Sequence, residues 1–359
     1  MVHRRAKLIL IASAAWFLLS ARPPGCLALP VDMGIAGPSY WTVVQTGGGT
    51  ITVTPPVSKS GKRKKSNRTV ATSAPPIGIM GNVAVAQGGQ ISDSGDQFEG
   101  DLYLGDDASA QFSGTYANNS PVSGIVHMSN GSTISPSTGY SFNNTSSGLQ
   151  PMLDQVRLDA MNASTASLAL SPTSTLNQIS LNRRKTLTLS AGVYDLTSLK
   201  LTHATLTLSG SGSFVFNISS TFALKSAQIL LANGATESNV LFNYTGTSDV
   251  TLSAGRRGTS VLHGIILAMN ANVNLAQGLV VGEIISGRNI TVGAGSLIQA
   301  ALLNVAPPFN VEAPRVQSVP EQTSTIVLTF IALCLLVGCR SLSVCRFSAS
   351  GTPKRIVSR

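Results

Sequence analysis

The feature that most constrains this chain is a long succession of short segments in which apolar and polar residues alternate. From residue 77 onward, stretches such as KTLTLS, ATLTLSG, SFVFNIS, DVTLSAG and NITVGAGS follow a period of two and end in Gly, Asn or Ser. Such alternation between turn residues predicts β-strands. The strands begin roughly ten residues apart, a spacing typical of β-sandwiches, barrels and β-solenoids.

Several of these segments are apolar on almost every residue, as in VLFNY, GIILA and GLVVGEIIS. A strand is apolar on almost every residue when both of its faces are buried. Strands that are stacked in a solenoid can have both faces buried. We therefore predict a mainly β fold, an irregular right-handed β-helix (solenoid) over residues 77–305.

One stretch, residues 148–170, breaks the pattern of alternation. Its apolar residues, among them Leu153, Val156 and Met161, recur every three or four positions, and Pro151 stands where the first turn of a helix tolerates proline. We predict one long amphipathic helix packed along the β-body.

The net charge of +10 is concentrated at the two ends of the chain. Nine of the 25 basic residues lie in the terminal segments, which leaves 16 basic residues against 15 acidic ones between them. Nucleic-acid binding is therefore not expected, because it needs a concentrated basic face. A remaining basic run, KSGKRKKSNR at 59–68, lies between Pro-rich stretches and predicts a linker over residues 29–76.

Both ends of the chain carry apolar segments. Residues 1–28 have a basic head, an apolar run and small residues, as in a secretory signal peptide with a short helix. A second apolar helix is expected within residues 319–340, after a linker at 306–318 and before a basic tail at 341–359. No cysteine occurs from residue 27 to residue 333, so the body has no disulfide framework.

The body offers no recognisable catalytic constellation. Its histidines, His127, His203 and His263, are isolated in the sequence, and no hydrolase, nucleotide-binding or zinc motif occurs. The acidic stretch at 93–107 lacks the spacing of a calcium loop. We expect neither an enzyme nor a bound cofactor or metal.

Threonines two residues apart point to the same face of a strand. Thr186, Thr188, Thr205 and Thr207 form two such pairs, and Thr50, Thr52 and Thr54 form another series. A flat set of hydroxyl and methyl groups could order water as an ice lattice does, so the first four are candidates for an ice-binding face. Threonine is also simply a good strand former.

The order of the segments GNVAVAQGGQISDSGDQFEGDLYLGDD, NASTASLALSPTS, NVLFNYTGTSDVTLSAG and HGIILAMNANVNLAQGLVVGEIISGRNI resembles the choice-of-anchor A family of bacterial surface proteins. The C-terminal half is also similar to the ice-binding β-solenoid proteins. Both resemblances imply an irregular β-solenoid with one packed helix.

The end of the chain resembles a PEP-CTERM sorting signal. Val319, Pro320 and Glu321 precede the apolar run, and Arg340 follows it. The resemblance implies an exosortase-like enzyme that cuts beside Pro-Glu. The 19 residues after Arg340 depart from that pattern, and without a cut the segment serves as a single-pass membrane anchor.

The sequence is compatible with three different functions. The main prediction is an exported, non-enzymatic, adhesin-like protein of the cell surface or extracellular matrix, at least transiently membrane-anchored, with surface polysaccharide or matrix components as partners. The alternative is an ice-binding protein. An enzyme acting on polysaccharide is disfavoured because it needs paired carboxylates in a groove.

Overall fold

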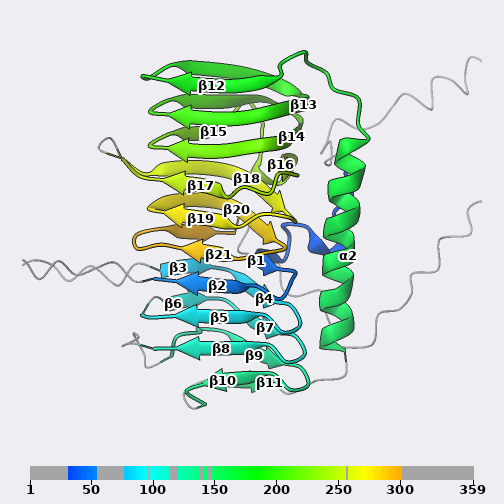
Figure 1. Ribbon diagram of the computed structural model, residues 1–359, viewed down its shortest axis with the longest axis vertical. Coiled ribbons are helices and arrows are strands. Elements are labelled where there is room, and N and C mark those ends of the chain that lie inside the picture. Colours follow the sequence, from blue (N-terminus) through cyan, green and yellow to red (C-terminus); the bar gives the residue numbers. More distant parts are fainter. Residues whose placement is uncertain are drawn as a thin grey trace, which may run out of the picture. The chain divides into compact units, whose positions relative to one another are not determined.

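The computed structural model describes residues 31–54, 77–95, 97–113, 120–137, 141–143, 148–255 and 258–300. These residues form a mainly β fold with a single long helix, α2 (Leu149–Leu168), beside the strands (Figure 1). Two short 3-10 turns are η1 (Gly34–Ala36) and η3 (Glu237–Asn239). The strands are β1 (Trp41–Gln45), β2 (Thr50–Val53), β3 (Ile77–Met80), β4 (Asn82–Val85), β5 (Gln90–Asp93), β6 (Gln97–Glu99), β7 (Leu102–Leu104), β8 (Ser109–Phe112), β9 (Ile125–Met128), β10 (Thr133–Ser135), β11 (Ser141–Asn143), β12 (Gln178–Asn182), β13 (Thr186–Thr202), β14 (Thr205–Lys225), β15 (Gln228–Ala232), β16 (Val240–Tyr244), β17 (Val250–Ser253), β18 (Ser260–Ala268), β19 (Val273–Ala276), β20 (Gly278–Ser286), β21 (Ile290–Val292) and β22 (Leu297–Gln299).

The strands pair in parallel and belong to three ladders. The two longest strands show the pattern, because β13 and β14 pair over three successive segments: 186–190 with 205–209, 192–196 with 214–218, and 198–202 with 221–225. Each of these two passes of the chain thus adds one strand to each ladder in the same order.

We name each ladder by what its outer face presents. The hydroxyl ladder is β12, residues 198–202, residues 221–225, β17, β19, β21, β2, β5, β8 and β10. The helix ladder is residues 192–196, residues 214–218, β16, the second halves of β18 and β20, β1, β4, β7, β9 and β11. The aliphatic ladder is residues 186–190, residues 205–209, β15, the first halves of β18 and β20, β22, β3 and β6.

The strands do not stack in chain order. β1 pairs with β20 on one side and with β4 on the other, and β2 likewise joins β21 to β5. The N-terminal strands therefore close the junction between the two halves of the stack, although residues 29–76 were expected to form a linker. Local sequence cannot show this, because the partners of β1 and β2 lie more than 200 residues away on one side.

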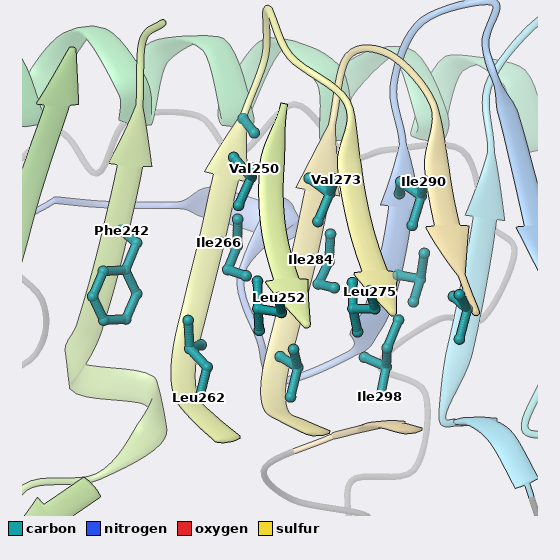
Figure 2. Close-up of a cluster of buried hydrophobic side chains, with 14 of the residues drawn as sticks. Phe242, Val250, Leu252, Leu262, Ile266, Val273, Leu275, Ile284, Ile290 and Ile298 are labelled. Atoms are coloured by element: carbon teal, nitrogen blue, oxygen red, sulfur yellow. The ribbon is translucent and has the colours of Figure 1, made fainter. Parts of the chain in front are cut away.

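The space between the ladders is filled by aliphatic and aromatic side chains. Tyr194, Phe216 and Phe242 occupy matched positions on three neighbouring strands and stack with ring centroids 5.0 Å apart. Figure 2 shows the same core further along, with Val273, Leu275 and Ile284 among its buried side chains. In-register packing of this kind keeps successive passes parallel.

Helix α2 covers the outer face of the helix ladder, as the sequence predicted. Leu153, Val156, Ala160 and Ala163 are buried against that ladder. Strand β16 is consequently buried on every residue, which explains the apolar run VLFNY. Met161 was expected in the apolar face, but it is 43% exposed, and Leu158 on the same helix is 51% exposed. In its C-terminal half the helix instead turns the small residues Ala160, Ala163 and Ser167 inward, which lets its backbone approach the sheet.

Several predicted segments lie outside the described residues. They are the signal helix at 1–28, the hydrophobic helix at 319–340 and the tail at 341–359. Within the described ranges, no helix combines the length and apolarity that a membrane span requires.

Candidate functional site

The middle of the hydroxyl ladder presents a row of short polar side chains on five neighbouring strands. Register places Thr251 beside Asn274, Asn274 beside Thr291, Thr291 beside Thr52, and Thr52 beside Ser92. All five residues are partly exposed. Together they form what we call the central row.

Each member of the central row stands between two buried residues. Thr251 lies between Val250 and Leu252, and Thr291 lies between Ile290 and Val292, all of which are buried. Figure 2 shows the inward side chains of these strands gathered in the core. Because side chains alternate along a strand, the central residue of each strand must face outward.

The spacing within the row follows from strand geometry. Neighbouring strands lie about 4.8 Å apart, so the row repeats at about that distance along the ladder. Residues two apart on one strand, such as Thr50 and Thr52, are separated by roughly 6.7 Å on the same face. The result is a two-dimensional array of small side chains.

Asparagines fix one edge of this array. Asp249 accepts hydrogen bonds from the side chains of Asn272 (2.8 Å) and Asn274 (2.7 Å). The Asn289 side chain accepts a hydrogen bond from the backbone N–H of Thr50 at 2.8 Å. These contacts cross from strand to strand and hold the polar groups in place.

The array carries little charge. On β17, β19, β21, β2 and β5, the outward side chains are threonine, serine, asparagine, glutamine or alanine. Asp249 at the edge has both of its carboxylate oxygens bonded to asparagines. The one other carboxylate on these strands, Asp93, is buried.

The four threonines singled out from sequence do come together, but on another ladder. Thr186 pairs with Thr205 and Thr188 with Thr207, which makes a two-by-two grid on the aliphatic ladder. The grid ends there, since the next strand places Gln228 and Leu230 in the same two positions. Further along, the outward residues of this ladder are mostly aliphatic and partly exposed: Val261, Leu279, Val281 and Leu297.

The remaining candidates from sequence do not join this site. Val319, Pro320, Glu321 and Arg340 of the sorting signal lie outside the described residues. The acidic stretch is dispersed: Asp101 accepts from the N–H of Ile125, and Asp106 from Ser129 and the N–H of Asn130. The described part of the chain holds no cluster of three metal-ligating side chains.

A sequence signal for the central row exists, but it is faint. The triplets VTL, VNL, ITV, ITV and ISD each place one polar residue between residues that become buried. Of the five polar residues, only Thr52 stood out in the sequence, as part of the series Thr50, Thr52 and Thr54. The register that aligns them depends on pairings between distant segments, which the triplets alone do not specify.

Comparison with known proteins gives one family. The family model described as Ice-binding-like matches residues 69–306. No curated protein sequence matches the chain.

The chain is also similar to several solved structures. An ice-binding protein from an Arctic yeast is 17% identical, with 77% of this chain and 96% of that one covered and a TM-score of 0.45. An ice-binding protein from an Antarctic Flavobacteriaceae bacterium is 19% identical, with 78% and 48% covered and a TM-score of 0.44. A domain of a Shewanella frigidimarina ice-binding protein is 18% identical, with 77% and 99% covered and a TM-score of 0.41.

The family match corrects the main prediction from sequence. The adhesin-like function was wrong, because the matching family is the one expected for the alternative, ice binding. The match spans most of the described strands as well as α2. The chain therefore belongs to the ice-binding-like family.

Proposed function

We propose that this protein binds ice, without catalysis, through the central row of the hydroxyl ladder. The observation that carries the proposal is the uncharged array of Thr52, Ser92, Thr251, Asn274 and Thr291 on five neighbouring strands. Membership of the ice-binding-like family supports the same function.

The physical reason lies in what an ice surface offers. It is an uncharged lattice of water molecules, so a charged side chain would give up its own hydration to approach it. Threonine presents a hydroxyl that can join the lattice and a methyl that orders the water beside it. A rigid sheet holds these groups in a fixed array, and little conformational entropy is lost on adsorption.

The test is thermal hysteresis and inhibition of ice recrystallisation by the purified protein. The variant T52Y/T291Y places two large side chains at adjacent positions in the central row. We expect it to lose most of both activities while its unfolding temperature stays close to that of the parent, because both side chains face solvent.

The matched control is T188Y/T207Y, which makes the same change at adjacent positions of the threonine grid. We expect this variant to retain both activities. If the control loses both activities and T52Y/T291Y retains them, the ice-binding face is instead the grid of Thr186, Thr188, Thr205 and Thr207. An inactive parent protein would contradict ice binding altogether.

We also propose that the three ladders wind as the irregular right-handed β-solenoid predicted from sequence. The order in which the segments of β13 and β14 join the three ladders supports this winding.

The signal-like residues 1–28 support export, and Val319, Pro320, Glu321 and Arg340 remain candidates for exosortase-like processing. The choice-of-anchor A resemblance likewise remains a proposal. Intact-mass analysis of protein from cells and medium tests the processing: loss of residues beyond about 320 would support sorting, and an intact C-terminus would favour a retained anchor.

A further inference from the structure

A second surface lies at the β12 end of the stack, where basic side chains gather. Between Asp159 and Glu237 the chain has five basic residues and a single acidic one, Asp195. The five are all exposed, and we call them the basic end: Arg183, Arg184, Lys185, Lys200 and Lys225.

Backbone pairing brings these five residues to one edge of the fold. Lys200 and Lys225 face outward on neighbouring strands of the hydroxyl ladder, and strand geometry sets their Cα atoms roughly 8 Å apart. Arg183, Arg184 and Lys185 form the turn from β12 to β13. That turn stacks on the turn of the next pass. The N–H of Arg184 donates to the carbonyl of His203 at 2.6 Å, and the N–H of His203 donates to the carbonyl of Lys225 at 2.9 Å.

Nothing in the described part of the chain neutralises the basic end. None of its side chains takes part in an ion pair with a described residue. Asp195 lies on the helix ladder instead, where it accepts a hydrogen bond from Asn217 at 2.9 Å. Repulsion among uncompensated cations costs stability, so the arrangement favours a polyanionic partner.

We propose that the basic end binds a carboxylated polysaccharide. Several cations on one edge match a polymer that carries one carboxylate per repeating sugar. Nucleic acid fits less well, because single strands are held by stacking on aromatic side chains. The aromatic residues of this region, Tyr194, Phe214, Phe216 and Phe222, are all buried.

The probe is polygalacturonate, with neutral dextran as the reference polymer. For this measurement the parent is a variant with glutamine in place of Lys62, Arg63, Lys64 and Lys65, which removes four of the six positive charges of the separate basic run at 59–68. We expect the parent to bind polygalacturonate and not dextran, with affinity that falls as salt is raised. K200Q/K225Q should weaken binding about tenfold, given up to about 1 kcal/mol for each exposed ionic contact.

The matched control is R157Q/R288Q, which removes the same charge from two exposed arginines on α2 and in the turn before β21. It should bind within about twofold of the parent, because neither arginine belongs to the basic end. An equal loss of affinity in both variants would contradict binding at the basic end, because affinity would then depend on net charge alone. Tighter binding to single-stranded DNA than to polygalacturonate would overturn the choice of ligand. Ice recrystallisation, measured on the same samples, reports on the separate ice-binding proposal.

Discussion

At the scale of single residues, two carboxyl groups, one on β20 of the helix ladder and one directly before β7, should respond to pH in opposite directions. Glu283 is completely buried beside Ile265, and neither of its oxygens has a hydrogen-bond partner among the described residues. Burial raises the pKa of Glu283 well above its ordinary value. A raised folded-state pKa gives stability that is present below the unfolded pKa and is lost as pH rises.

E283Q should therefore stabilise the fold more at high pH than at low pH. The amide does not ionise, so the variant escapes the cost of keeping a carboxyl protonated in the core. We expect a gain of about 1–3 kcal/mol at pH 8 relative to pH 4. Thermal unfolding at the two pH values measures it, and a difference between variant and parent that does not change with pH would refute this explanation.

Asp101 is the opposite case. Its carboxylate accepts hydrogen bonds from the N–H of Ile125 (2.7 Å) and from Tyr103 (3.3 Å), and His127 lies 3.6 Å away. Burial alone would raise the pKa of Asp101, but His127 and these hydrogen bonds together lower it. The stability that this carboxylate contributes is present above its unfolded pKa and is lost as pH falls.

D101N should accordingly destabilise the protein at neutral pH by about 1–2 kcal/mol and by less near pH 3, where the parent has lost the same contribution. Chemical denaturation at both pH values measures the difference. An equal loss at the two values would show that the charge of Asp101 is unimportant.

At the scale of elements, a buried polar network joins α2 to the helix ladder. Asn243 is fully buried, and its side chain bonds to Ser164, Ser167 and Asn217. N243A should cost about 2–3 kcal/mol, because its partners lose bonds in a site that water does not reach. N162A, at an exposed position on the same helix, should change stability by less than about 0.5 kcal/mol. Equal unfolding free energies for the two variants would contradict a role of this network in holding the helix.

At the scale of the whole described domain, the sequence predicted local structure better than long-range order. The alternation in KTLTLS, ATLTLSG and NITVGAGS marked strands β13, β14 and β21 correctly, and the three-to-four spacing over 148–170 marked α2. The placement of β1 and β2 between the two halves of the stack was not predicted, because it depends on pairings such as Val43 with Ile284.

The candidate site was harder to predict for the same reason. Thr52, Thr251 and Thr291 come from distant parts of the sequence, and only the sheet register aligns them. The pairs Thr186 with Thr188 and Thr205 with Thr207 were easier to notice, because each is local. Spacing alone could not tell which ladder each pair faces.

The most direct test of the central claim is incorporation of the protein into a slowly growing ice shell. The parent and the T188Y/T207Y control should be enriched in the ice, whereas T52Y/T291Y should stay in the liquid as a non-binding solute does. Equal incorporation of T52Y/T291Y and the parent, or exclusion of the parent itself, would contradict an ice-binding face on the hydroxyl ladder.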